Sequence, residues 1–229
     1  MKTMKLLFVV IVAVTTARAG DVTGKVSFDG TPPKGQRLKM NADPVCMKAH
    51  KDAVLSEEVV ANPNGTLRNV LVYVKEGLGS KKFDPPSAKV EFDQSGCMYS
   101  PHVLGIQTGQ ELIVKNSDPT LHNVHSLSKD NPQFNVAQPK KGMTLSKKFD
   151  KPEVFKVKCE VHTWMGAYMG VFSHPFFAVT GPDGSFSIKK LPAGDYTIEA
   201  WHEKYGSQTM RVKVSATGSA TADFKFTVK

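Results

Sequence analysis

The sequence predicts an all-β protein, and three observations support this. Short runs of alternating apolar and polar residues recur along most of the chain, separated by Gly, Pro, Asn and Asp. Only residues 44–54 favour a helix, and that helix is expected to be short. No internal repeat, coiled coil or low-complexity tract interrupts the alternation. We therefore expect short strands assembled into β-sandwiches.

The first expected strand, residues 22–28, ends at the turn-forming sequence Asp29-Gly30-Thr31-Pro32-Pro33. The second, residues 70–74, consists of Val, Leu and Tyr and is expected to be buried. Asp183-Gly184 predicts a tight hairpin turn between two later strands. The remaining strands are expected at residues 90–92, 111–115, 144–149, 154–159, 176–180, 185–188, 196–201, 209–214 and 221–228.

Residues 1–19 have the layout of a secretory signal peptide. Lys2 and Lys5 precede an apolar run at 6–14, and Ala17-Arg18-Ala19 supplies a small-x-small cleavage site. The run is about half as long as a bilayer-spanning helix, so no membrane span is expected after cleavage. Cleavage removes three basic residues, Lys2, Lys5 and Arg18, and lowers the formal net charge from +9 to +6. We therefore expect a periplasmic or secreted protein.

The segment Cys159-Glu160-Val161-His162-Thr163-Trp164-Met165 is the most informative part of the chain. It brings a thiol, an imidazole and a thioether together, and His122 offers a second imidazole from an earlier segment. Alternation places Cys159 on the apolar face of its strand, so its sulfur should point inward. A thiolate, two imidazoles and one weak thioether are the ligands of a blue-copper electron-transfer centre. Met169 is the alternative to Met165 as the thioether.

The chain has three cysteines, Cys46, Cys97 and Cys159. In an oxidising compartment two of them are expected to pair. A disulfide between Cys46 and Cys97 would leave Cys159 free to hold a metal ion. Cys46-x3-His50 and Cys97-x4-His102 also have the spacing of ligand pairs, so a second metal site is the alternative.

Three motifs follow one another within residues 88–172: the run from Ser100-Pro101 to Lys115-Asn116, His122-Asn123 after a turn, and the Cys-x-x-His-x-x-Met loop. Together they resemble a cupredoxin, which implies the Greek-key β-sandwich of type 1 copper proteins. This short loop is similar to that of the amicyanin-type and plastocyanin-like members. Thr163 and Trp164 make the loop bulkier than is usual in the family. This bulk bears on whether the imidazole of His162 is exposed to solvent, as it is in the family.

The cupredoxin resemblance implies a bound copper ion and a set of residues that hold it. The implied ligands are His122, Cys159, His162 and Met165. The resemblance also assigns a supporting role to Asn123, whose side chain would tie the two ligand loops together.

The tail of the chain combines a hairpin at 183–186, a turn at 191–196 and the segment Tyr205-Gly206-Ser207-Gln208-Thr209. This combination resembles a carboxypeptidase regulatory-like domain, which implies a transthyretin-like β-sandwich. The opening strands that this family needs stand near the other end of the chain, at residues 22–26 and 70–74. We therefore expect a discontinuous sandwich from residues 20–80 and 174–229, with a cupredoxin-like domain, residues 85–173, inserted into it. Two modules in tandem are the alternative.

These observations predict an exported electron carrier that cycles between Cu(II) and Cu(I) and is not an enzyme. The expected partner is a redox protein such as a cytochrome or an oxidoreductase, and the lysines between residues 140 and 158 would steer an acidic one. Nucleic acid is not expected as a partner, because no nucleic-acid-binding motif accompanies the positive charge. The alternatives are a periplasmic copper-handling protein and a surface-binding module with accessory copper.

Overall fold

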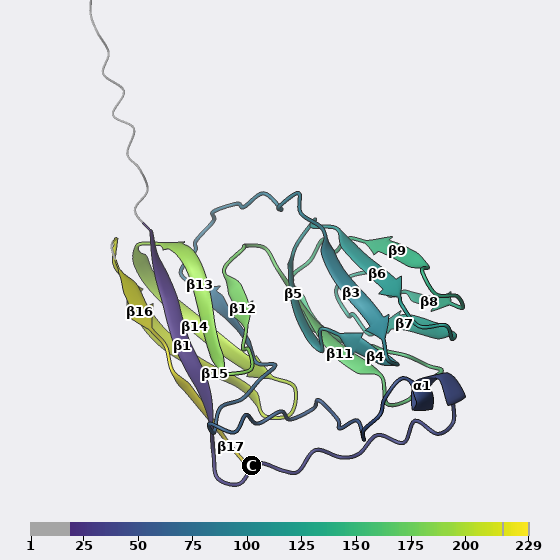
Figure 1. Ribbon diagram of the computed structural model, residues 1–229. Helices are drawn as coiled ribbons and strands as arrows, with labels where there is room; N and C mark the ends of the chain where they lie inside the picture. The colour runs from purple at the N-terminus through teal and green to yellow at the C-terminus, as the bar shows by residue number, and fades with distance from the viewer. Residues whose placement is uncertain (1–18, 217, 229) are drawn as a thin grey trace, which may run out of the picture.

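The computed structural model describes residues 19–216 and 218–228. These residues form strands β1 to β17 and a single short helix, so the chain is all-β as the sequence predicts. The strands belong to four sheets, which make two β-sandwiches lying side by side (Figure 1). The expected signal peptide, apart from Ala19, lies outside the described residues. Within the described part of the chain, no helix has the length and apolar character needed to cross a membrane.

The first sandwich combines strands from both ends of the described chain. In one sheet, β1 (Ala19–Asp29) pairs with β13 (Ser185–Pro192), β16 (Ser219–Thr221) and β17 (Phe224–Thr227). The facing sheet has the order β12 (Phe177–Val179), β2 (Leu71–Glu76), β14 (Gly194–His202) and β15 (Gly206–Val214).

Alternation along β1 places Val22 and Val26 in the core of the first sandwich. Gly24 stands between them because β1 and the chain near Ala222 approach closely. A Cβ atom at Gly24 would lie 1.9 Å from the carbonyl oxygen of Ala222. Strands β16 and β17 replace the single strand expected at residues 221–228. Between them, the carboxylate of Asp223 accepts the backbone N–H of Lys25, in place of the backbone hydrogen bond that a continuous strand would make with β1.

The second sandwich is built from the middle of the chain. One sheet has the order β5 (Val103–Gln107), β11 (Gly166–Phe172), β10 (Glu153–Lys158), β7 (His122–Ser126) and β8 (Asn135–Gln138). The facing sheet has the order β4 (Met98–Ser100), β3 (Val90–Ser95), β6 (Leu112–Asn116) and β9 (Thr144–Lys147). The sequence analysis did not predict β4, β5, β7, β8 or β11, most of which are short and break the simple alternation of apolar and polar residues.

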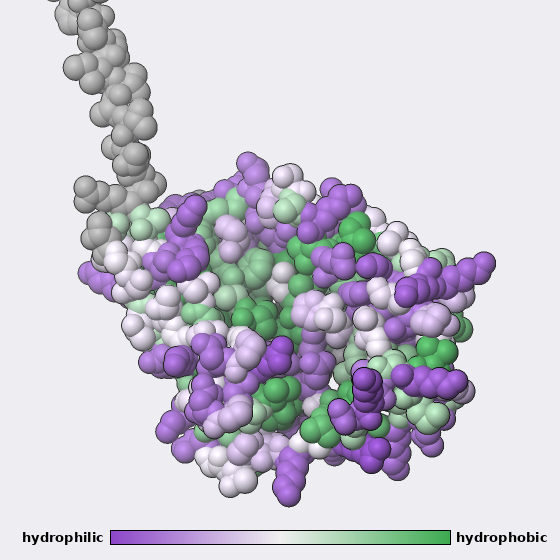
Figure 2. Space-filling view, in the orientation of Figure 1, coloured by the Kyte–Doolittle hydropathy of each residue, from purple (hydrophilic) through white to green (hydrophobic). Residues whose placement is uncertain are grey.

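Aromatic side chains fill the seam between the two sandwiches. The ring of Phe172 in β11 lies 4.6 Å from Tyr73 in β2 and 4.9 Å from Phe177 in β12, measured between centroids. Tyr168 of β11 meets Trp201 of β14 at 5.0 Å. On the face of the molecule drawn in Figure 2, hydrophobic residues lie mainly near the middle, and hydrophilic residues cover most of the remaining surface. The seam therefore joins the two sandwiches through apolar contacts.

The segment between β1 and β2 leaves the first sandwich, reaches the second and returns (Figure 1). At its far point lies α1 (Pro44–Lys48), a shorter helix than the sequence predicts, capped by the carboxylate of Asp43. Met40 and Cys46 belong to the core of the second sandwich, although residues 20–80 were expected to serve the first. This excursion places Asp43 and Cys46 beside the loops at the end of the second sandwich.

Candidate metal centre

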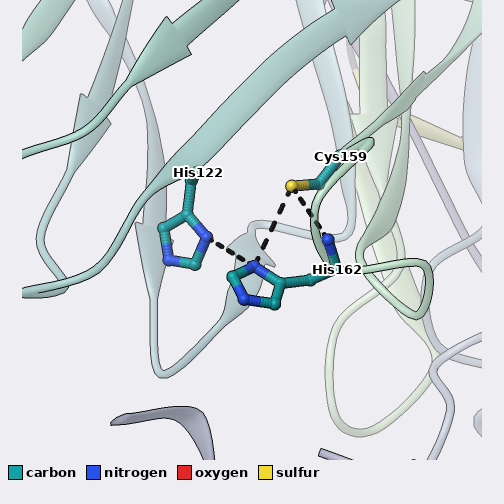
Figure 3. Close-up of side chains that lie close together, drawn as sticks. All are labelled: His122, Cys159 and His162. Atoms are coloured by element: carbon teal, nitrogen blue, oxygen red, sulfur yellow. Dashed lines mark hydrogen bonds between the residues drawn. The ribbon is translucent and has the colours of Figure 1, made fainter. Parts of the chain in front are cut away.

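Three donor atoms converge where β7 begins and β10 ends: Nδ1 of His122, Nδ1 of His162 and Sγ of Cys159 (Figure 3). The two Nδ1 atoms are 3.0 Å apart, and Sγ is 4.0 Å from Nδ1 of His162. Two nitrogen donors bound about 2.0–2.1 Å from one ion lie roughly 3.0–3.5 Å apart at bond angles of about 95–115°, and a nitrogen and a sulfur donor at wider angles lie roughly 3.6–4 Å apart. The three atoms therefore fit one metal ion.

The loop between β10 and β11 brings His162 back beside Cys159. The backbone N–H of Cys159 donates to the carbonyl of Met165 at 3.1 Å, and that of Met165 donates to the carbonyl of His162 at 2.9 Å. The N–H of His162 also donates to Sγ of Cys159 at 3.4 Å. The side chains are closed off from solvent, with residue exposures of 0% for His122, 2% for His162 and 3% for Cys159.

Two buried methionines stand near this loop. Met165 belongs to the loop itself, whereas Met169 lies inside β11, opposite Phe155 of β10. Both side chains belong to the apolar core of the second sandwich. The place of Met165 in the loop favours it over Met169 as a thioether ligand.

Asn123 links the two segments that carry the donor atoms. Its side-chain oxygen accepts the backbone N–H of Glu160 at 2.5 Å, and its amide donates to the side chain of Asn135. The backbone carbonyl of Asn123 also accepts the hydroxyl of Tyr99 at 2.6 Å. The residue therefore lies where the resemblance assigns a link between the ligand loops.

A carboxylate holds the outer nitrogen of each imidazole. Nε2 of His122 lies 2.9 Å from Oδ2 of Asp118, and Nε2 of His162 lies 3.1 Å from Oδ2 of Asp43. Metal-binding histidines commonly donate their second N–H to a carboxylate, which fixes the tautomer and leaves the other nitrogen to the metal. Both carboxylates are themselves held. Asp118 accepts the backbone N–H groups of Gly96 and Cys97. Asp43 accepts the backbone N–H of Val45 and the side-chain hydroxyl of Thr120.

The sequence analysis missed both aspartates. Asp118 stands four residues before His122 in Ser117-Asp118-Pro119-Thr120, which also has the composition of an ordinary turn. Its spacing from the histidine is the signal that could have identified it. Asp43 lies 119 residues from His162 in the chain, and no local pattern connects the two.

Cys46 and Cys97 form a disulfide, which ties the excursion at α1 to the second sandwich. The alternative in which Cys46 with His50 and Cys97 with His102 act as ligand pairs of a second metal site is therefore wrong, because both sulfurs are already bonded. Nε2 of His50 is instead 2.6 Å from the carbonyl oxygen of Gly96.

The disulfide also covers His162. Sγ of Cys46 lies 3.6 Å from Nε2 of His162. Trp164, whose ring centroid is 5.0 Å from that of His162, donates its indole N–H to the carbonyl of Cys97 at 3.1 Å. These contacts explain why this imidazole has almost no exposure to solvent.

The surroundings of two of the donor atoms, Sγ of Cys159 and Nδ1 of His162, favour their metal-binding forms. Burial raises the pKa of the Cys159 thiol, but hydrogen bonds with the His122 side chain and with backbone N–H groups outweigh burial and lower it. A lower pKa favours the thiolate, which is the form of cysteine that binds metals. Burial and the nearby charge of His122 lower the pKa of His162, which keeps this imidazole neutral. Burial lowers the pKa of His122, but hydrogen bonds with Asp118 and Cys159 outweigh burial and raise it to about 9, so a metal ion has to displace a proton from this imidazole.

The tail of the chain matches a known family over part of its length. Residues 165–228 match the family model of the β-sandwich domain of ER membrane protein complex subunit 7. The matched residues contain β11 to β17, which include most strands of the first sandwich. The match supports a β-sandwich in this part of the chain. Among curated proteins, none matches the chain at a significant level.

Solved structures similar to this chain include copper proteins. The Cu-containing nitrite reductase from Thermus scotoductus SA-01 is 23% identical over 42% of this chain, with a TM-score of 0.33, and only 24% of that protein is spanned. A purple cupredoxin from Nitrosopumilus maritimus is 22% identical, with 36% of this chain and 98% of that one covered and a TM-score of 0.32. A mutant of amicyanin in its Cu(I) form is 17% identical, with 44% and 97% covered and a TM-score of 0.33. No functional conclusion rests on similarities at these TM-scores.

Proposed function

We propose that this chain is an exported type 1 copper protein that carries electrons. The observation that carries the proposal is the convergence of Nδ1 of His122, Nδ1 of His162 and Sγ of Cys159 at one buried point. Two imidazoles and one thiolate, with a weak thioether such as that of Met165, are the donor set that suits a blue-copper centre. A copper ion held there would supply a one-electron Cu(II)/Cu(I) couple.

The protein's own residues hold the donors in place. Asp118 and Asp43 fix the tautomer and ring orientation of the two histidines, and Asn123 ties the two donor loops together. The disulfide at Cys46 and the indole of Trp164 keep water away from His162. A site that is both rigid and dry suits electron transfer, because few groups must move when the charge changes.

The closed site argues against the copper-handling alternative. A protein that delivers copper needs ligands that a partner can reach, whereas His122 and His162 are almost wholly buried. We also infer that the chain is not an enzyme, that its partner is a redox protein such as a cytochrome or an oxidoreductase, and that it works in the periplasm or outside the cell. The disulfide between Cys46 and Cys97 supports an oxidising compartment.

We further propose that the chain has a discontinuous domain organisation. Strand β1 pairs with β13, β16 and β17, and β2 pairs with β12 and β14, while β3 to β11 form sheets of their own. This pairing supports a cupredoxin-like domain, residues 85–173, inserted into a regulatory-like sandwich formed by residues 20–80 and 174–229.

Titration of the mature chain with Cu(II), followed by visible absorption, tests the electron-carrier proposal. We expect an intense thiolate-to-copper charge-transfer band at one equivalent, which Cys159→Ser abolishes. His125→Ala is the matched control, because His125 lies on the same strand as His122 but bonds to Glu160 at the surface. Absence of the band from the wild-type chain would contradict the proposal, and a colourless complex that prefers Cu(I) would favour copper handling.

A further inference from the structure

A polar cavity of about 200 Å³ lies where the two sandwiches and the excursion between β1 and β2 meet. Glu57 and Glu58 line it from the excursion, His102 from the second sandwich, and Glu203 from the turn after β14. Trp164, which covers the candidate copper centre on one side, lines this cavity as well. The cavity is therefore close to the centre described above but is built from different side chains.

His102 is the unusual residue of this cavity. It is only 9% exposed, and its Nε2 bonds to the carboxylate of Glu203. Its Nδ1 is buried and makes no hydrogen bond within the described part of the chain. Nδ1 faces Oε2 of Glu57 at 3.9 Å, which is too far for a hydrogen bond. Native proteins rarely leave a buried polar atom without a partner, so this nitrogen calls for an explanation.

The arrangement repeats what the structure shows at the candidate copper centre. Asp118 holds Nε2 of His122 and Asp43 holds Nε2 of His162, and in both cases Nδ1 is the atom that faces the other donors of the proposed copper centre. Glu203 holds Nε2 of His102 in the same way. A carboxylate on Nε2 leaves the lone pair on Nδ1, which is the form of histidine that binds metals.

We propose that His102 and Glu57 bind a second metal ion, a divalent transition metal such as Cu²⁺ or Zn²⁺. With metal–ligand bonds of about 2.0 Å, the 3.9 Å between Nδ1 and Oε2 places the two atoms on nearly opposite sides of the ion, an arrangement that the square-planar geometry of Cu²⁺ accepts and that a tetrahedral ion reaches after a small shift of Glu57. The side chain of Glu57 is 34% exposed, so it has room to adjust to the angle that the ion requires. Glu203 acts here as a positioning residue, because it touches His102 and not the ion.

The charge around the cavity suits a cation. Three carboxylates line it, from Glu57, Glu58 and Glu203, against one ammonium group, from Lys156. Glu58 is partly neutralised by Lys204 at 2.8 Å, which leaves Glu57 as the carboxylate directed at His102. Met98 also lines the cavity, and its thioether or water can occupy the remaining coordination positions. Nitrogen and oxygen donors bind Cu²⁺ most tightly among the divalent first-row metals, so Cu²⁺ is the preferred occupant.

Counting metal ions per chain tests this proposal. The full mature chain is saturated with Cu²⁺, desalted, and analysed by elemental mass spectrometry and by electron paramagnetic resonance. We expect two ions per chain in the wild type and one in His102→Ala, with the charge-transfer band of the Cys159 site unchanged. Cys159→Ser should lose that band while the His102-dependent ion stays. Failure of the electron-carrier proposal is therefore distinguishable from failure of this one.

Two further variants make the result specific. Glu57→Gln keeps the shape of the side chain and the pair between His102 and Glu203, and should weaken binding of the second ion at least tenfold. His125→Ala is the control, since Nδ1 of His125 is already bonded to Glu160 at 2.6 Å, and it should retain both ions. Equal metal counts in the wild type and His102→Ala would overturn the proposal. They would indicate instead that His102 only joins the two sandwiches, through its contact with Glu203.

Discussion

Oδ2 of Asp43 lies 3.1 Å from Nε2 of His162, on the side of the imidazole that faces away from Cys159. The two residues are 119 positions apart in the chain, and the excursion that carries α1 brings them together. The same carboxylate caps α1 by accepting the N–H of Val45 at 2.7 Å. Asp43 therefore both caps the helix of the excursion and holds the imidazole of His162, a candidate metal ligand, in its orientation.

Replacing Asp43 tests this link. Asp43→Asn keeps an oxygen that can cap α1, but the NH2 group that replaces Oδ2 cannot accept a hydrogen bond from Nε2 of His162. Loss of such a partner weakens metal binding by about 10–100-fold, and we expect this effect on copper affinity, measured by competition with a chelator. Asp52→Asn, an exposed aspartate of the same excursion, should change nothing. Equal affinities in the two variants would show that Asp43 does not orient His162.

The disulfide between Cys46 and Cys97 should stabilise the fold as well as cover the centre. It joins residues 51 positions apart, and closing a loop of that length is expected to contribute about 4 kcal/mol to the free energy of unfolding. We expect the double variant Cys46→Ser and Cys97→Ser to lose roughly this amount in urea denaturation of the metal-free chain. Reductant should lower the stability of the wild type and leave the double variant unaffected. A double variant as stable as the wild type would show that the excursion is held by other contacts.

The reduction potential distinguishes the two methionines that could supply the thioether ligand, Met165 and Met169. The axial ligand tunes the reduction potential of a blue-copper centre. Replacing it with an apolar side chain leaves the more highly charged Cu(II) with one donor fewer, which raises the potential. We expect Met165→Leu to raise the potential measured by voltammetry. Met169→Leu, a similar change in the same core, should alter the potential much less. The opposite pattern would assign the thioether to Met169.

Glu153 should make the second sandwich sensitive to acid. Burial raises the pKa of Glu153, but hydrogen bonds from Ser128, Asn131 and the Lys129 backbone outweigh burial and lower the pKa to about 2. Because the pKa is lower in the folded state than its usual value of 4.5, this stabilisation is present above about pH 4.5 and is lost as the pH falls toward 2.

Glu153→Gln should therefore lower the free energy of unfolding at pH 7 by about 1–3 kcal/mol and flatten its dependence on pH below 5. Denaturant titrations at several pH values measure both effects. Glu91→Gln, at an exposed position of β3, is the control and should have little effect. If the two variants share one pH profile, the hydrogen bonds to Glu153 do not account for the acid response.

The sequence predicted the all-β class and brought His122, Cys159 and His162 to attention because these features are encoded locally. Alternation is visible within a few residues, and Cys159 and His162 lie in one short loop. Asp43 and the excursion around α1 were missed, because they depend on contacts between residues far apart in the chain. The strands at His122–Ser126 and Gly166–Phe172 were missed for a different reason: buried residues interrupt their alternation, so no period of two remains to be recognised.

X-ray absorption at the copper edge of copper-loaded His102→Ala, which keeps only the Cys159 centre, compared with the same chain carrying Cys159→Ser, tests the central claim most directly. We expect one short bond to sulfur and two bonds to imidazole nitrogen in His102→Ala, with the short sulfur bond absent when Cys159 is also replaced. A copper environment of nitrogen and oxygen alone in His102→Ala, unchanged by the second substitution, would contradict the account.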